Sequence, residues 1–198
     1  MLLTGPPGTG KTLIARAIAG EANCRFFYAS GSQFDGMFRG SGKDNIKSLF
    51  KAAKKGGPAI IFIDELDSLA GKRERGGSRN SINQLLAELD GFQKNDKVIF
   101  IGATNMEDAI DSAVMRSGRI DKVVRIPLPD IKGREKIISY YINKVKSEAI
   151  DVQMMAKRTI GFSGADLRNY VNTAVIHAVR QGKEKAARDD FDYAYDRI

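Results

Sequence analysis

The sequence predicts an α/β fold with a largely parallel sheet, followed by a smaller helical domain. Short apolar runs alternate with helically spaced apolar residues along residues 1–129, and this alternation is typical of βαβ units around a parallel sheet. No convincing strand follows Pro127 and Pro129, and the remaining apolar residues have helical spacing. We therefore expect a large α/β domain at residues 1–129 and a helical domain at residues 130–198.

The strands are expected where short apolar runs occur. Residues 60–63 and 98–101 are apolar throughout, which predicts central strands buried on both faces. Only three residues lie between Met1 and the first glycine loop, whereas a strand normally has about 5–6 residues. The chain therefore looks like an excised part of a longer protein. The expected strands are residues 2–4, 25–30, 59–64, 98–105 and 122–127.

Helices are expected between and after these strands. Apolar residues recur at i, i+3, i+4 and i+7 from Ile46 and again from Ile82, so each set forms one stripe that faces a core. Residues 137–145 mark an amphipathic helix of the second domain. Ser163 is a candidate N-cap, with Asp166 three residues later, for a helix that carries His177. We expect this histidine to be a packed or solvated residue.

Composition excludes several classes of protein. The chain has 198 residues, 42% hydrophobic and 28% charged, with one cysteine and one histidine. An internal disulfide and a zinc site of several imidazoles are therefore excluded. The net charge of +8 is spread along the chain, so we do not expect a nucleic-acid partner. The sequence has no run of about 20 apolar residues, and we expect this chain to be soluble.

The segment GPPGTGKT at residues 5–12 fits the pattern G-x-x-x-x-G-K-[ST] between an expected strand and an expected helix. Its glycines allow backbone N–H groups to surround a phosphate, next to the positive end of the helix dipole. We expect Lys11 to reach the β and γ phosphates and Thr12 to bind Mg²⁺. The predicted phosphate-binding residues are Gly5, Pro6, Pro7, Gly8, Thr9, Gly10, Lys11 and Thr12.

Two acids follow the apolar strand at residues 59–64. Asp64 and Glu65 are therefore expected at the carboxyl edge of the sheet, where the phosphate loop also lies. We expect Asp64 to hold Mg²⁺ and Glu65 to orient and polarise the attacking water. A solvated strand end is the alternative, and the neighbouring phosphate loop disfavours it.

Three further residues are weaker candidates. Asn105 follows another strand and could hydrogen-bond the water or the γ-phosphate. Arg116 and Arg119 flank a Ser-Gly pair shortly before the last expected strand. Such arginines could stabilise a transferring phosphate, although surface arginines are the alternative.

Together, GPPGTGKT, FIDELD at residues 62–67, GATN at residues 102–105 and RSGRID at residues 116–121 resemble the AAA class of AAA+ ATPases. Residues 28–35, 83–92 and 161–167 are similar to FtsH-type membrane-bound AAA proteases, of which the mitochondrial i-AAA type looks closest. Tyr141 supports that choice, because bacterial members typically have histidine there, near the adenine. The resemblance covers essentially the whole chain.

This resemblance implies a P-loop NTPase fold with a five-stranded parallel sheet of order 5-1-4-3-2 and a small α-helical lid. ATP or ADP would bind with Mg²⁺, and Tyr141, Gly164 and Ala165 would contribute from the lid. Family members act as hexameric rings, so Arg116 and Arg119 would serve the neighbouring subunit's ATP. Residues 90–92 match the family's intersubunit signalling segment. The isolated chain is expected to be monomeric.

The resemblance also implies a motor that unfolds and threads protein substrates for an attached zinc metalloprotease. The substrate-gripping pore loop maps to Phe38, Arg39 and Gly40, with Phe38 as the gripping aromatic residue. No H-E-x-x-H motif occurs, so this chain does not cleave peptide bonds itself. The parent protein is expected in the mitochondrial inner membrane, or in a bacterial or chloroplast membrane, with its anchor outside this chain.

Two alternative functions remain open. The first is a nucleotide-binding module that does not turn over when isolated, with ATP as an assembly switch. Glu65 disfavours a permanently inactive switch, because only hydrolysis needs the second carboxylate. The second is a non-proteolytic AAA ATPase that remodels other molecules, including nucleic acid. The scattered basic charge disfavours a nucleic-acid substrate.

Overall fold

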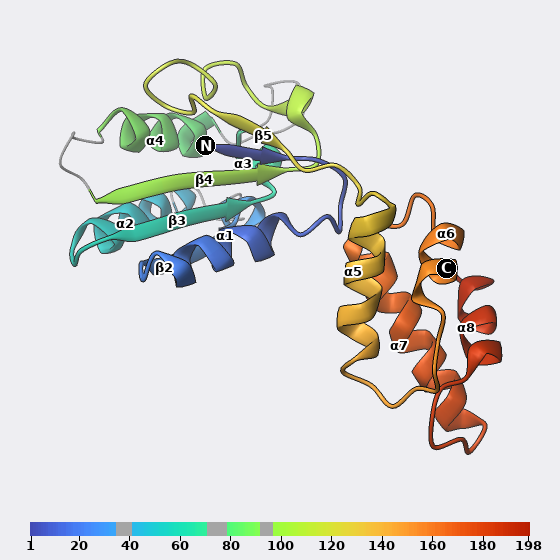
Figure 1. Cartoon of the computed structure of the whole chain (residues 1–198). Coiled ribbons are helices and arrows are strands. Elements are labelled where there is room, and N and C mark those ends of the chain that lie inside the picture. The colour runs from blue at the N-terminus through green and yellow to red at the C-terminus, as the bar shows by residue number, and fades with distance from the viewer. Residues whose placement is uncertain (35–40, 71–78, 92–96) are drawn as a thin grey trace. The chain divides into compact units, whose positions relative to one another are not determined.

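Five strands form one parallel sheet in the order β2-β3-β4-β1-β5 (Figure 1). The computed structural model describes residues 1–34, 41–70, 79–91 and 97–198. Counted from the other edge, the strand order is 5-1-4-3-2, so this prediction is confirmed. The fourth and fifth strands are shorter than expected. The strands are β1 (Leu2–Thr4), β2 (Arg25–Ser30), β3 (Ala59–Asp64), β4 (Val98–Thr104) and β5 (Val123–Arg125).

The chain divides into two compact units. The first consists of Met1–Gly5 and Lys11–Ile126, and the second of Pro6–Gly10 and Pro127–Ile198. The first unit holds the sheet and the helices that cover it. The second unit holds the helices that follow Pro127 together with most of the glycine loop.

Successive side chains of each strand point to opposite faces of the sheet, so the first unit has an apolar layer on each face. Leu2, Ile61 and Ile63 pack in one cluster with residues of α2, α3 and α4. Leu3 and Phe62 point to the opposite face and pack with residues of α1. The helices of this unit are α1 (Lys11–Glu21), α2 (Ser41–Lys54), α3 (Leu66–Ala70) and α4 (Arg79–Asp90), with short 3₁₀ turns η1 (Gly31–Phe34) and η3 (Glu107–Ala109).

The predicted burial of the two central strands is confirmed for β3 and is wrong for the start of β4. Residues 60–63 are at most 1% exposed. Ile99 is paired with Ile60 in register, yet it is 54% exposed. Ile101 and Ala103, further along the same face of β4, are buried with Ala15 and Ala19 of α1, whereas Ile99 belongs to no apolar cluster of the described residues.

The second unit is a set of helices around its own apolar core (Figure 1). Leu167, Tyr170 and Phe191 lie in this core and are almost completely buried. The two short helices, α6 and α8, were not predicted, because seven or eight residues are too few to show a clear helical repeat of apolar positions. The helices are α5 (Ile131–Ile142), α6 (Val152–Arg158), α7 (Gly164–Arg180) and α8 (Arg188–Tyr195).

The start of α7 is fixed by the capping box that the sequence predicts. The Asp166 backbone N–H donates to Ser163 Oγ over 3.3 Å, and the Ser163 backbone N–H donates to Asp166 Oδ2 over 2.9 Å. Ser163 Oγ also donates to the same carboxylate oxygen over 2.8 Å. These bonds satisfy N–H groups that have no partner inside the helix.

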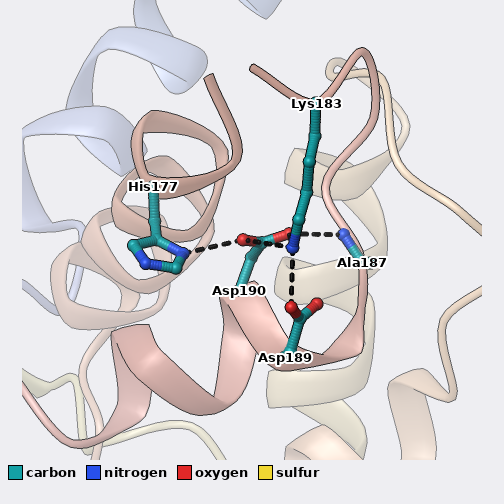
Figure 2. A network of polar contacts seen from close by, with 5 residues as sticks. All are labelled: His177, Lys183, Ala187, Asp189 and Asp190. Atoms are coloured by element: carbon teal, nitrogen blue, oxygen red, sulfur yellow. Dashed lines mark hydrogen bonds and ion pairs between the residues drawn. The ribbon is translucent and has the colours of Figure 1, made fainter. Parts of the chain in front are cut away.

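A buried carboxylate joins α7 to α8. Asp190 is 0% exposed and lies between His177 and Lys183 (Figure 2). His177 Nδ1 is 2.7 Å from Asp190 Oδ1, Lys183 Nζ donates to both carboxylate oxygens over 3.1 Å, and the Ala187 N–H donates over 2.8 Å. Burial acts to raise the pKa of Asp190, but these hydrogen bonds outweigh it and hold the pKa below its usual value. The expectation of a packed His177 is confirmed, since its ring also stacks on Tyr193 at 3.7 Å between centroids.

We predict that Asp190→Ala destabilises the second unit by about 3 kcal/mol at pH 7, because it leaves buried donors without their acceptor. Asp189→Ala is the matched control, because Asp189 is an exposed neighbouring acid that also binds Lys183. Urea denaturation followed by circular dichroism measures the difference, and amide exchange in α7 and α8 locates it. Since folding lowers the pKa of Asp190, its contribution is present above about pH 4 and declines as the pH falls through the native pKa. A difference that grew toward pH 3 would contradict this role.

Candidate active site

The predicted site residues of the first unit follow the carboxyl ends of neighbouring strands. The glycine loop follows β1, Asp64 ends β3, and Asn105 follows β4. Because β1 pairs with β4 and β4 pairs with β3, all in parallel, these ends lie at one edge of the sheet. In open α/β sheets, ligands bind outside this edge.

A hydrogen bond connects the start of α1 to the end of β3. Thr12 Oγ1 donates to Asp64 Oδ2 over 2.7 Å, and the Glu65 backbone N–H donates to Asp64 Oδ1 over 3.0 Å. Both carboxylate oxygens are therefore held in place. A hydroxyl and a carboxylate are the oxygen ligands that Mg²⁺ accepts in proteins, so these two side chains fit that ion.

Lys11 lies at the first position of α1 and is 7% exposed. Its Nζ donates to the Gly5 carbonyl over 2.9 Å, so the ammonium folds back over the glycine loop. Burial lowers the pKa of Lys11 from its ordinary value, and the nearby carboxylate of Asp64 opposes that shift. A phosphate in the loop would give this ammonium charged acceptors.

The glycine loop depends on residues without a Cβ at two positions. Gly5 has a φ of +144°, and a Cβ there would lie 2.1 Å from the Ile126 carbonyl oxygen. Gly8 has a φ of +75°, and within the second unit a Cβ there would lie 2.5 Å from Ser163 Oγ. Both positions therefore require glycine on grounds of backbone conformation and of space.

Glu65 has a positive φ of +49° and is exposed. Ser30 Oγ donates to Glu65 Oε2 over 3.1 Å and lies 2.7 Å from Ser32 Oγ. Ser30 was not predicted as a site residue. The strand order contained a signal for it, because β2 is next to β3 and Ser30 is in register with Asp64. The structure thus gives the proposed water-activating carboxylate a hydroxyl partner from the adjacent strand.

The candidates Asn105 and Arg116 are both exposed. Arg116 begins a turn in which the Arg119 N–H donates to the Arg116 carbonyl over 3.1 Å, and Gly118 has a φ of +89°. In the part of the chain that the structure describes, the Arg116 guanidinium forms no ion pair. This is the arrangement of a cation that faces outward from the first unit.

Arg119 is engaged within its own chain. Its Nε is 2.7 Å from Asp90 Oδ1 and its Nη2 is 2.8 Å from Asp90 Oδ2, a bidentate pair with the last residue of α4. The hydrogen bond to Arg119 lowers the pKa of Asp90 and raises the pKa of the guanidinium. The structure therefore separates two arginines to which the sequence analysis gave the same role.

The remaining predicted residues lie in the second unit or outside the described residues. Tyr141 is half-buried against the core of the second unit and meets the Tyr140 ring edge-on at 5.1 Å. Gly164 begins α7, and the Ala165 N–H donates to the Gly8 carbonyl over 3.1 Å within this unit. The expected pore loop, Phe38, Arg39 and Gly40, lies outside the described residues.

Comparisons with known proteins agree with this arrangement. The family model for the ATPase family associated with various cellular activities (AAA) matches residues 1–128. The model for the AAA+ lid domain matches residues 149–193. Among the described residues, no helix is both long and apolar enough to cross a membrane.

Three relatives illustrate the similarity over 100% of this chain. The ATP-dependent zinc metalloprotease YME1L1 of Mus musculus is 52% identical, and the chain covers 28% of it. The ATP-dependent zinc metalloprotease FTSH 11, chloroplastic/mitochondrial, of Arabidopsis thaliana is 49% identical, with 25% covered. The ATP-dependent zinc metalloprotease FtsH of Halothermothrix orenii is 47% identical, with 32% covered.

The chain thus spans between a quarter and a third of the length of these curated relatives. The predicted resemblance to FtsH-type AAA proteases of the mitochondrial i-AAA type is confirmed. The AAA match covers most of the chain, and the lid match lies in its helical part. The chain belongs to the AAA family of ATPases, and its AAA domain is of the FtsH type.

Proposed function

We propose that this chain is the Mg-dependent, ATP-hydrolysing motor module of a membrane-bound zinc metalloprotease. The observation that carries the proposal is the 2.7 Å hydrogen bond between Thr12 and Asp64, because it joins the phosphate-loop helix to the acidic strand end. In this reading Lys11 binds the β and γ phosphates of ATP. Thr12 and Asp64 hold Mg²⁺, which supplies positive charge where charge develops on the phosphate oxygens.

Glu65 is the proposed catalytic base. Its carboxylate accepts a hydrogen bond from a water molecule and orients the water oxygen toward the γ-phosphorus. Glu65 takes a proton from this water as the water oxygen bonds to phosphorus and the bond to the β,γ-bridging oxygen breaks, which yields ADP and phosphate. Glu65 then passes the proton to the phosphate or to solvent. Asn105 donates its amide N–H to the γ-phosphate or accepts from the same water. The exposure of Glu65 and Asn105 leaves both side chains accessible to ATP and water.

The proposed assembly is a homo-hexamer in which Arg116 reaches the ATP of the neighbouring subunit. Its exposure and the turn that carries it support this role. Arg119 is proposed for the same interface, and it would have to leave the carboxylate of Asp90 to reach a phosphate. At low concentration the isolated chain is then a monomer with an incomplete site, and assembly completes the site as the concentration rises.

The other parts of the proposal rest on the resemblance to FtsH-type proteins. The ATPase domain is proposed at residues 1–129 and the lid domain at residues 130–198, with Tyr141, Gly164 and Ala165 as the nucleotide contacts of the lid. Phe38, Arg39 and Gly40 grip an unfolded protein substrate. The protease works in a mitochondrial, chloroplast or bacterial membrane.

The test is the steady-state rate of Mg-ATP hydrolysis per subunit over a wide range of protein concentration. Because the arginine comes from a neighbour, we expect a rate that rises with concentration and then saturates. A constant nonzero rate would contradict the assignment of arginines in trans. The absence of turnover at every concentration would instead favour a nucleotide-binding module without turnover. The ion pair of Arg119 with Asp90 also favours that alternative, because it keeps the arginine within its own chain.

We predict that Glu65→Gln retains ATP binding and loses turnover by about 10²-fold or more. Binding depends on Lys11 and the loop, whereas hydrolysis needs a carboxylate beside the water. Equilibrium binding of a fluorescent ATP analogue and single-turnover hydrolysis measure the two properties separately. Glu21→Gln is the control, because Glu21 is an exposed acid at the end of α1. Normal hydrolysis by Glu65→Gln would remove Glu65 from the mechanism.

Mixing two inactive variants tests the neighbour's arginine directly. Arg116→Ala retains Glu65 but lacks the arginine, whereas Glu65→Gln retains Arg116 but lacks the carboxylate. In a random ring, on the order of a quarter of the interfaces pair an intact Glu65 with an intact Arg116. We therefore expect turnover in the equimolar mixture and none in either variant alone. A mixture as inactive as its components would place Arg116 outside the neighbour's site.

A further inference from the structure

A buried hydroxyl fixes the backbone on both sides of Asn105. Thr104 is the last residue of β4 and is 1% exposed. Its Oγ1 accepts a hydrogen bond from the Met106 N–H over 3.0 Å. The same hydroxyl donates to Asp67 Oδ1 over 2.6 Å, a short, charge-assisted bond. The chain therefore turns at Asn105 around an anchored side chain.

Asp67 lies in the first turn of α3, two residues after Glu65. The helix can approach β4 closely because residue 102 is a glycine, where a Cβ would lie 2.6 Å from Leu66 Cδ2. Leu66 is 0% exposed and packs in the core beneath the sheet edge. Gly102 and Leu66 thus bring Asp67 within reach of Thr104, although the two are 37 residues apart in the sequence.

We propose that Thr104 and Asp67 are positioning residues for ATP hydrolysis, which hold Asn105 in a fixed position relative to Glu65. The inference rests on the proposed function of Glu65 and Asn105 and goes beyond it. Asp67 belongs to the segment that carries Glu65, and Thr104 is adjacent to Asn105 in sequence, so one hydrogen bond connects the two reactive side chains through their backbones. Neither Thr104 nor Asp67 contacts the nucleotide in this mechanism.

The physical reason is that catalysis by positioning is sensitive to small displacements. A shift of about 1 Å in a group that orients the attacking water costs on the order of 10²-fold in rate. Asn105 is exposed, so packing does not hold its side chain. Thr104 supplies the missing constraint, because its hydroxyl acts as donor and acceptor at once, which a valine of similar shape cannot do.

The experiment compares Thr104→Val with Thr104→Ser at saturating protein concentration. We expect Thr104→Val to lower kcat about tenfold or more while the KM for ATP changes less than about twofold. Thr104→Ser keeps the hydroxyl and should restore most of kcat. Asp67→Ala removes the acceptor from the less buried partner and should reproduce the loss, which keeps the test valid if Thr104→Val folds poorly.

Thr159→Val is the matched control for the loss of a buried hydroxyl. Thr159 is 0% exposed in the second unit, and its Oγ1 donates to the Met155 carbonyl over 3.0 Å. Its hydrogen bond joins two residues of the second unit and none of the site residues of the first, so this variant should leave kcat unchanged even where stability falls. An equal loss of kcat in Thr159→Val would overturn the inference in favour of general destabilisation.

A double-mutant cycle separates positioning from a direct role. If Thr104 acts through Asn105, Thr104→Val has little further effect in an Asn105→Ala background. Independent, multiplying effects would overturn the inference. A normal kcat in Asn105→Ala alone would contradict the proposed function of Asn105 and overturn this inference with it.

A readout without turnover distinguishes failure of the inference from failure of the proposed function. We expect the side-chain amide resonance of Asn105 to shift when a non-hydrolysable ATP analogue binds the unchanged chain or Thr104→Ser, and not Thr104→Val. The same shift in Thr104→Val would overturn the positioning role. If the unchanged chain hydrolyses no ATP at any concentration, the proposed function fails, while this resonance still decides whether Thr104 positions Asn105.

Discussion

The candidate site depends on the parallel pairing of β1 with β4 and of β4 with β3. This pairing places the glycine loop, Asp64 and Asn105 at one edge of the sheet, although they are far apart in the sequence. The sheet can maintain it because β3 is buried on both faces, with Ile61 and Ile63 in one apolar layer and Ile60 and Phe62 in the other. A register shift of one residue would exchange these faces. The core therefore fixes the position of the polar residues.

Contiguous motifs were predictable from the sequence, and contacts between motifs were not. The loop at residues 5–12 and the pair Asp64 and Glu65 carry their chemistry in consecutive residues, so spacing was sufficient. Ser30 and Asp67 have partners that depend on strand order and on how closely α3 packs on β4. The exposure of Ile99 was also not predictable, because an apolar strand sequence does not show how far along the strand the covering helix extends.

The ion pair of Arg119 is another contact that could not be predicted from the sequence. The sequence places Arg116 and Arg119 on one loop, but only the structure shows that Asp90 binds Arg119. The bond connects that loop to the end of α4. In a ring, any movement of Arg119 toward a neighbour's phosphate would break this connection, so the free energy of the Asp90 pair opposes that movement. The end of α4 and the arginine loop are therefore expected to respond to the same event.

Each acid of the segment Asp64-Glu65-Leu66-Asp67 has a hydroxyl partner from a different element. Thr12 of α1 holds Asp64, Ser30 of β2 holds Glu65, and Thr104 of β4 holds Asp67. A hydroxyl orients a carboxylate without bringing an opposite charge to it. In the second unit, by contrast, Lys183 forms an ion pair with the buried Asp190. The charge of that carboxylate is neutralised within the fold, where it stabilises the packing of α7 against α8. Under the proposed function, the three hydroxyls leave the negative charge of Asp64 and Glu65 available for Mg²⁺ and the attacking water, and they fix how each carboxylate is oriented.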